Sequence, residues 1–252
     1  LLIWFVPQIA SIVKKMIVPT KDEKKDVQYK LEYFSTGVQP IPEIAIIEAK
    51  KEVIKMSSLI YEMLDLFIDT FKNSTKIEKS ISEARKLEDT SDQMQEQIST
   101  YLAECTKHEL SLRSSKGAAA MMRLTNELES IGDSSLNLFL QLEKLDNDVK
   151  FNNEMNSEIN KLYSIVEKFI KWNNLFIENN IKPMTQKDLN ESIKYENNID
   201  EIRNKLIDSS KDRLINKELN PKAEIIFMDI TKHLEHIGDY SLNISQALNK
   251  IN

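Results

Sequence analysis

The sequence predicts an all-α protein built from two tandem three-helix bundles. Residues that break helices are scarce, with four glycines and six prolines in 252 residues. Apolar residues recur at intervals of three and four over several long stretches, as on amphipathic helices. A decapeptide also occurs twice, 106 positions apart and identical at eight of ten positions, as LESIGDSSLN at 128–137 and LEHIGDYSLN at 234–243. Such a repeat indicates that one structural unit is used twice.

The composition excludes several classes of protein. Charged residues make up 29% of the chain and hydrophobic residues 41%, and the net charge is −6. A general nucleic-acid binder would be expected to carry a basic face, so we expect no nucleic-acid partner. The single cysteine, Cys105, excludes an internal disulfide and a cysteine-based metal site. Site chemistry therefore has to come from carboxylates and three histidines.

The first segment, residues 1–19, is interpreted as the end of a transmembrane or membrane-associated helix. Residues 1–13, LLIWFVPQIASIV, are mostly apolar and precede Lys14 and Lys15. They are too few to span a bilayer, which needs about 20 residues. Lysines that follow the apolar run do not fit a secretory signal but fit the cytoplasmic end of a membrane helix. The alternative is a core helix of a soluble protein. Residues 20–41 are predicted to be a linker.

The first three-helix unit is predicted at residues 42–149. Its first helix starts near Glu43 and carries an apolar stripe consisting of Val53, Met56, Ile60, Met63, Leu64, Phe67 and Phe71. Thr75 and Glu78 have the spacing of a capping box, which predicts the start of the second helix. Residues 114–117, SSKG, predict a turn, and the third helix is expected at about 118–145.

The second unit, residues 150–252, repeats this plan. A first helix is predicted at about 153–179, followed by a connection that contains Pro183. Thr185 and Asp188 predict the cap of the next helix. Asn220 followed by Pro221 predicts the start of the last one.

A Glu-x-x-x-Asp motif falls on the second and third helices of both units. The four pairs are Glu88 with Asp92, Glu129 with Asp133, Glu196 with Asp200, and Glu235 with Asp239. Side chains four apart share one face of a helix. One such pair alone is usually a solvated surface pair, but these four occupy corresponding places on otherwise apolar stripes. We therefore expect the carboxylates to face the bundle interiors.

Carboxylates that converge on one place repel one another, and this repulsion has to be offset by protonation or by a cation. Two like charges about 4 Å apart repel by roughly 4 kcal/mol at an effective dielectric near 20, and desolvation adds to this cost. Either the groups are protonated or a multivalent cation lies between them, and a metal site is the simpler account. Oxygen ligands suit Mg²⁺, Ca²⁺, Mn²⁺ or iron better than a typical zinc site, although a carboxylate-bridged cluster can hold zinc.

Other residues near the motifs are candidates for supporting roles. Asn137 and Asn243 follow each repeated Asp by four positions, so each either hydrogen-bonds a ligand carboxylate in a second shell or faces solvent. Gly132 and Gly238 are expected where another helix approaches closely, or as simple packing notches. Among the histidines only His233 is weighed as a ligand, and surface or second-shell positions are favoured for all three.

The repeated decapeptides resemble the third-helix signature of the PhoU family of phosphate-uptake regulators, and the arrangement from about residue 43 onward is similar to that family. This resemblance implies multinuclear iron or zinc clusters at the eight motif carboxylates. The N-terminal part resembles the join between the last membrane helix and the PhoU-like tail of bacterial sodium/phosphate cotransporters. It consists of an apolar segment that ends in lysines, then a linker, then PEIA at 42–45 leading into AKKEVIKM at 49–56. Ser130 and His236 depart from the family, whose third helices have a basic residue beside the motif Glu.

We therefore expect a cytoplasmic regulatory, metal-binding domain of a sodium-dependent phosphate transporter, at the cytoplasmic face of a bacterial inner membrane. Its expected partners are the membrane part of the same or another chain, or a second copy in a homodimer. The alternatives are a free-standing regulator of phosphate uptake or signalling and a metal-free helical adapter. Dinuclear carboxylate oxidases use Glu-x-x-His, and no histidine here has Glu three residues before it, so we do not expect an enzyme.

Overall fold

The structure, a computed structural model, describes residues 29–30, 42–73, 77–107, 109–145, 149–216 and 220–251. Within these ranges the chain forms six helices and no strand, which confirms the all-α prediction. The helices are α2 (Pro42–Lys72), α3 (Ile77–Cys105), α4 (Leu112–Leu142), α5 (Asn153–Ile177), α6 (Gln186–Asn216) and α7 (Pro221–Asn249). No helix in the described part is both long and apolar enough to span a membrane. The interpretation of residues 1–19 falls outside the described residues.

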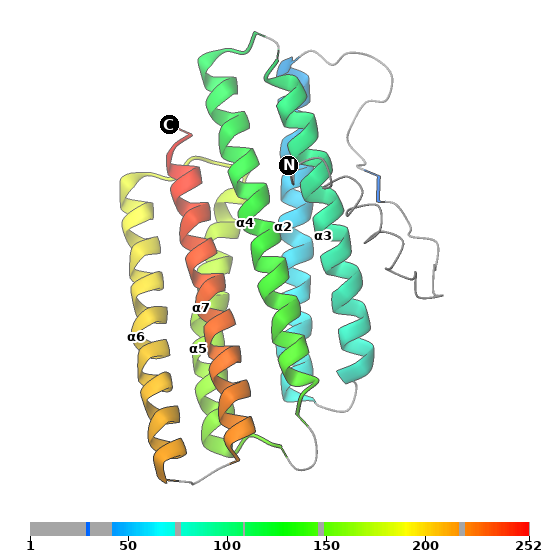
Figure 1. Ribbon diagram of the computed structural model, residues 1–252. Coiled ribbons are helices and arrows are strands. Elements are labelled where there is room, and N and C mark those ends of the chain that lie inside the picture. The colour runs from blue at the N-terminus through cyan, green and yellow to red at the C-terminus, as the bar shows by residue number, and fades with distance from the viewer. Residues whose placement is uncertain are drawn as a thin grey trace, which may run out of the picture.

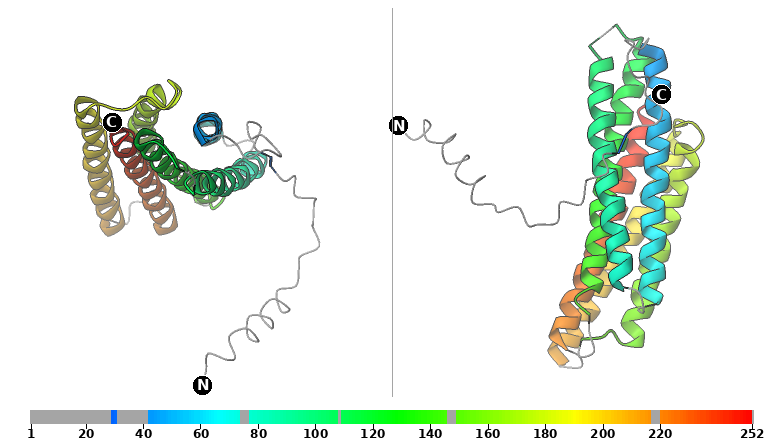
Figure 2. Two further views of the ribbon diagram at one scale, coloured as in Figure 1. Left: turned by 90° about the horizontal axis from the view of Figure 1, so that it is seen from above. Right: turned by 90° about the vertical axis from the view of Figure 1, so that its right-hand side faces the viewer.

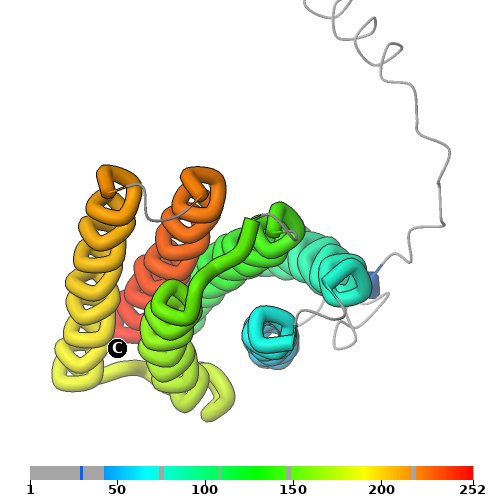
Figure 3. The backbone as a smooth tube through the Cα atoms, turned by 90° about the horizontal axis from the view of Figure 1, so that it is seen from below, coloured from blue at the N-terminus to red at the C-terminus, as the bar shows by residue number. Residues whose placement is uncertain are grey.

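The helices form the two predicted tandem bundles. Helices α2, α3 and α4 pack together, as do α5, α6 and α7, and α4 packs against α7 to join the two bundles. Figure 1 shows the six helices side by side along one long axis. Figures 2 and 3 show that α3, α4, α7 and α6 form one curved layer, with α2 and α5 both on the same face of it. The two helices that carry the repeated decapeptide thus lie at the centre of the layer.

Two of the predicted helix starts are confirmed by hydrogen bonds. The backbone N–H and hydroxyl of Thr185 donate to Asp188 Oδ2 at 2.9 and 2.7 Å, and Asp188 N–H donates back to Thr185 Oγ1 at 3.3 Å, which completes a capping box. Asn220 Oδ1 accepts from Lys222 N–H at 2.9 Å, with Pro221 as the first residue of α7. The predicted cap at Thr75 lies outside the described residues.

The predicted start of the third helix is wrong. Helix α4 begins at Leu112, so residues 114–117 lie in its first two turns instead of a separate turn. Ser111 provides the cap, because its hydroxyl accepts from Ser114 N–H at 3.1 Å. A glycine costs a helix about 1 kcal/mol, a cost small enough for the cap and the packing of α4 to offset at Gly117.

Apolar packing fills both bundles with one continuous core. The stripe predicted on α2 is confirmed, since Val53, Met56 and Phe67 are fully buried. The Phe67 ring meets the edge of Phe139 from α4, with 5.7 Å between centroids. Between the bundles, Tyr163 on α5 donates its hydroxyl to the backbone carbonyl of Leu64 at 2.9 Å. The two bundles therefore pack as one body.

Candidate metal centres

The structure brings the predicted carboxylates together in two groups. In the first acidic cluster, Glu88 and Asp92 of α3 and Asp133 of α4 each offer a carboxylate oxygen, and these atoms lie within 4.8 Å of one another. The second acidic cluster contains Glu196 and Asp200 of α6 and Asp239 of α7 at the same spacing. Pairs that are far apart in sequence thus meet across the α3–α4 and α6–α7 contacts. The remaining two predicted ligands stand beside these groups.

Glu129 and Glu235 lie outside the tight three-residue groupings but within electrostatic range of them. Burial, and then the neighbouring Asp133, raise the pKa of Glu129. Burial, and then the neighbouring Asp239, raise the pKa of Glu235. Six of the eight predicted residues thus form the two close groups, and Glu129 and Glu235 are their neighbours.

The sequence predicts that the carboxylates face the bundle interiors. The structure instead places the clusters at the edges of the helix contacts. Asp92 and Asp133 are exposed and Glu88 is half-buried, whereas Ser91, Met94 and Ile98 form the buried face of α3. The apolar stripe is therefore displaced by about one position around the helix from the predicted one. The physical reason is desolvation: at the edge, the carboxylates keep part of their hydration, which a buried position would remove. An edge position also leaves the clusters accessible to a cation.

Mutual repulsion and partial burial make the ionised clusters unfavourable. Burial, followed by the charge of Asp92, raises the pKa of Glu88 to about 7. Burial also raises the pKa values of Asp92, Glu196 and Asp239, in each case with a neighbouring cluster carboxylate as the next cause. A bound multivalent cation would relieve this repulsion, since it attracts every carboxylate in the group.

The two clusters differ in the cations around them. Arg203 of α6 and His236 of α7 lower the pKa values of both Glu235 and Asp239, against the larger effect of burial. In the first bundle the position equivalent to Arg203, three residues after the motif Asp, holds Gln95, which donates to Asn126 at 2.8 Å. Arg203 was not predicted as part of the site, although its spacing of three from Asp200 places it on the same face. The second cluster therefore has a neighbouring arginine that the first lacks.

Neither asparagine donates to a candidate ligand carboxylate among the described residues. Asn137 donates to the backbone carbonyl of Asp133 at 2.9 Å. Asn243 donates to Glu127 at 3.0 Å and accepts from Arg123 at 3.3 Å. This second set of bonds connects α7 to α4, so Asn243 contributes to the contact between the bundles.

The histidines also lie outside the two groupings. His233 is half-buried, its Nδ1 has no hydrogen-bond partner among the described residues, and burial lowers its pKa. His236 Nε2 lies 3.7 Å from Glu235 Oε2, at the margin of the second cluster. His108 is outside the described residues. The candidate sites are thus built from carboxylate oxygens.

The mid-helix glycines allow the close helix contact that was predicted for them. A Cβ at Gly238 would lie 2.9 Å from Ile199 Cδ1, and a Cβ at Gly132 would lie 3.0 Å from Ile60 Cδ1 and 3.2 Å from Ser91 Oγ. Both glycines directly precede a motif aspartate. The close approach of α6 to α7, and of α3 to α4, brings the paired carboxylates within reach of one metal ion.

Replacing Gly238 by leucine is expected to lower the free energy of unfolding by about 1–3 kcal/mol, because the added side chain overpacks the contact with Ile199. Urea denaturation monitored by circular dichroism measures this. Gly117→Ala is the matched control, since no atom lies within 4 Å of a Cβ at that position. The control should be neutral or slightly stabilising, and equal destabilisation of both variants would contradict this account of Gly238.

The two clusters share Tyr240 as a neighbour. Tyr240 of α7 has a raised pKa, chiefly because it is partly buried, and the charges of Glu127, Asp239, Asp133 and Glu129 also raise it. Carboxylates of both clusters therefore affect the pKa of this one side chain.

The fold and the two clusters define a class of protein: a tandem pair of three-helix units, each with an acidic group between its second and third helices. The chain belongs to the family of the PhoU domain, whose model matches residues 53–140 and 159–248 and therefore more than half of the chain. The two matched ranges coincide with the two repeated units.

Solved structures of PhoU proteins have the same fold. The phosphate transport system regulatory protein PhoU from Streptococcus pneumoniae superposes with a TM-score of 0.71, at 13% identity, covering 84% of this chain and 96% of that one. PhoU from Pseudomonas aeruginosa superposes with a TM-score of 0.72, at 12% identity, covering 83% and 97%. A search of curated proteins found no match in sequence.

Proposed function

We propose that this chain is a metal-binding, cytoplasmic regulatory domain of a sodium-dependent phosphate transporter. The observation that carries the proposal is the PhoU family match over both units, each of which contains an acidic cluster. The similar protein from Streptococcus pneumoniae is described as a regulatory protein of a phosphate transport system. A regulator binds and responds, so we do not propose a catalytic role. The resemblance of the N-terminal part to a cotransporter join supports the transporter context, at the cytoplasmic face of the inner membrane.

The carboxylates of the two clusters fit a metal ion. In each cluster three oxygens converge within 4.8 Å, and a fourth carboxylate stands beside them. Glu88, Asp92, Glu129 and Asp133 would hold the first metal, and Glu196, Asp200, Glu235 and Asp239 the second. The donor set suits hard cations and iron, and a bridged zinc cluster is compatible with it. A bound metal would offset part of the negative charge of each cluster, so the charge of this surface patch would depend on metal loading.

That patch suits contact with a partner. Its proposed partner is the membrane part of the transporter, in the same or another chain, and a second copy of the domain is the alternative. Loading or loss of metal would change the charge of this face by several units and so change its affinity for an acidic partner surface.

We expect the first acidic cluster to bind metal more tightly than the second, because Arg203 competes electrostatically for Glu235 and Asp239. Arg203→Gln is expected to tighten binding at the second cluster by about tenfold, which corresponds to about 1.4 kcal/mol. Isothermal titration of the metal-free chain with Mn²⁺ or Zn²⁺ resolves the two sites. Lys205→Gln, on the same helix and exposed, is the charge-matched control. Equal tightening in both variants would show a general charge effect only.

Phosphate uptake tests the regulatory role. Bacteria that carry Asp92→Asn/Asp133→Asn in the chromosomal copy of this gene should lose the normal dependence of uptake on external phosphate and sodium. Uptake that is unchanged in this variant, and also when the whole domain is deleted, would contradict the proposal. If the gene encodes no membrane helices upstream of Leu1, the transporter part of the proposal is wrong, and the free-standing regulator is favoured.

A further inference from the structure

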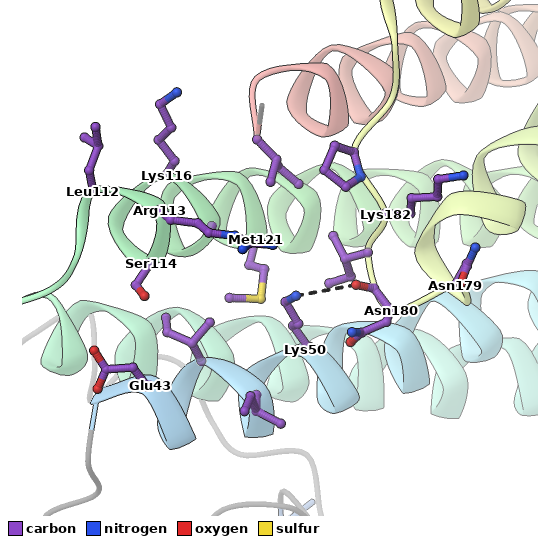
Figure 4. Close-up of a pocket in the computed structure, with 16 residues that line it drawn as sticks. Glu43, Lys50, Leu112, Arg113, Ser114, Lys116, Met121, Asn179, Asn180 and Lys182 are labelled. Carbon is purple, nitrogen blue, oxygen red and sulfur yellow. Dashed lines mark hydrogen bonds between the residues drawn. The ribbon is translucent and has the colours of Figure 1, made fainter.

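A large cavity lies at the end of the molecule where α2 and α4 begin. It has a volume of about 800 Å³ and is walled by the start of α2, the first turns of α4, residues 179–183 after α5, and Ile251 after α7. Figure 4 shows these segments around the cavity. None of its lining residues belongs to either acidic cluster. The cavity is therefore separate from the candidate metal centres.

The cavity is basic in a chain whose net charge is negative. Its lining contains four cationic side chains and, among the described residues, a single acidic one, Glu43, against a net charge of −6 for the chain. The cations are Lys50, Arg113, Lys116 and Lys182. We call this feature the basic cavity. Four cations from three separate segments converge on one space, which attracts an anion.

Lys50 and Arg113 are the two cations placed to contact a ligand. Figure 4 shows both extending toward the space between α2 and α4, while Lys116 and Lys182 lie at its rim. The two positive charges repel each other. Burial, and then the charge of the nearby Arg113, lower the pKa of Lys50. Within the described part of the chain, Lys50 Nζ donates one hydrogen bond, a long one of 3.5 Å to the carbonyl of Asn180. An anion between the two side chains would relieve their repulsion.

The start of α4 adds to the positive potential. The first backbone N–H groups of a helix have no partner within the helix, and the helix dipole adds a partial positive charge there. Arg113, Ser114 and Gly117 lie in the first two turns of α4 and line the basic cavity. Ser114 N–H already donates to Ser111 Oγ, and Gly117 lies beyond the first four residues, so the helix dipole and the N–H of Arg113 are what this helix start offers an anion. Helix starts commonly bind phosphate.

Part of the remaining lining is apolar, and the cavity leaves room for more than a phosphate ion. Ile46, Met121 and Ile181 contribute apolar wall, and no atom lies within 4 Å of a Cβ at Gly117. A volume of about 800 Å³ lies in the range of sites for organic ligands, about 300–1,000 Å³. The lining thus combines an anion site with an apolar surface.

We propose that the basic cavity binds a soluble organic phosphate, such as a nucleotide. Its phosphates lie between Lys50 and Arg113 at the start of α4, and its apolar part contacts Ile46, Met121 and Ile181. The site gives the chain a second input besides metal. Binding is independent of the acidic clusters, so it does not require the proposed metal-dependent regulation.

Isothermal titration of the metal-free full chain with ATP, in buffer without divalent cations, tests the proposal. We expect one saturable site for ATP, weaker binding of tripolyphosphate and of inorganic phosphate, and none of adenosine. Lys50→Gln/Arg113→Gln should weaken ATP binding by about tenfold or more, because two charge-assisted contacts are lost. Gly117→Leu should block binding without any change of charge, since its side chain would enter the cavity.

The matched control is Lys79→Gln/Arg85→Gln, two exposed cations near the start of α3 at the other end of the first bundle. It changes the net charge equally and should leave ATP binding intact. Circular dichroism and thermal melting establish that every variant is folded.

Four results overturn the proposal. They are absence of ATP binding, equal weakening in the control, retention of full affinity in Gly117→Leu, and loss of binding in Asp92→Asn/Asp133→Asn, which would place the ligand at the acidic cluster. Sedimentation with vesicles that contain an anionic phospholipid separates the two sources of phosphate. Binding to vesicles without binding to ATP assigns the site to a lipid headgroup and rejects a soluble ligand.

Discussion

Replacing Arg213 by methionine is expected to lower the free energy of unfolding by about 3–5 kcal/mol, among the largest effects of any single substitution in the chain. Arg213 of α6 and Glu224 of α7 are buried, with side-chain exposures of 6% and 0%. Arg213 Nε donates to Glu224 Oε1 at 2.8 Å, and Nη1 donates to Glu158 of α5 at 3.2 Å. Without the arginine, the buried Glu224 carboxylate has no cation beside it and keeps the hydrogen bond from the Ser210 hydroxyl, at 2.6 Å. Urea denaturation at neutral pH measures the loss.

The double variant Arg213→Met/Glu224→Met separates charge from packing. With the buried pair gone, stability should recover most of the loss, because buried ion pairs are often no better than apolar side chains of similar volume. Recovery is incomplete because Glu158 loses Arg213 and the Ser210 hydroxyl loses Glu224. Lys205→Met, which removes an exposed ion pair with Glu201 on the same helix, should leave the unfolding midpoint unchanged within error. A double variant as unstable as Arg213→Met would show that the network has a packing role that methionine cannot supply.

Metal should reverse the order of stability between the wild type and a variant of the first acidic cluster. With metal in thousandfold excess over its dissociation constant, the wild type should gain about 4 kcal/mol from each occupied cluster. Glu88→Gln/Asp92→Asn/Asp133→Asn should lose the part of this gain that comes from its cluster. In metal-free buffer at pH 8 the same variant should be more stable than the wild type, by about 1–2 kcal/mol once solvent screening is allowed for. Thermal melts with and without EDTA measure both differences.

The pH dependence of the metal-free wild type follows from the raised pKa of Glu88. Below pH 4.5, its ordinary pKa, this carboxyl group is protonated in both states and costs nothing. Between pH 4.5 and about 7 it ionises in the unfolded chain but not in the folded one, so stability falls over this interval. The variant should lack this fall. A fall of equal size in both proteins would assign it to other groups.

The helices, and the position of Glu and Asp on one helix face within each motif, could be predicted because both depend on local spacing. Thr185 with Asp188, and Asn220 with Pro221, mark helix starts through contacts within a few residues. The predicted start of α4 was too late. Residues 114–117 taken by themselves favour a turn, but the packing of α4 outweighs this local preference. Recurrence of the decapeptide identified α4 and α7, the two helices at the centre of the layer.

The missed features depend on contacts between residues distant in sequence. A prediction from hydrophobic periodicity assigns charged residues to the exposed face of a helix. It therefore could not predict that Arg213 and Glu224 are buried together. It also could not separate the buried face of α3, through Ser91 and Met94, from the adjacent edge that carries Glu88. The basic cavity brings together α2, α4 and the segment after α5, and no local motif marks that convergence.

Elemental analysis of the full chain tests metal binding by the acidic clusters most directly. The protein is purified without chelators from cells grown with iron, zinc and manganese, and its metal content is measured by mass spectrometry. We expect at least one metal ion per acidic cluster, with about half lost in Asp92→Asn/Asp133→Asn and the other half in Asp200→Asn/Asp239→Asn. Wild-type protein without bound metal, or variants with the full wild-type content, would contradict the assignment of these carboxylates as metal ligands.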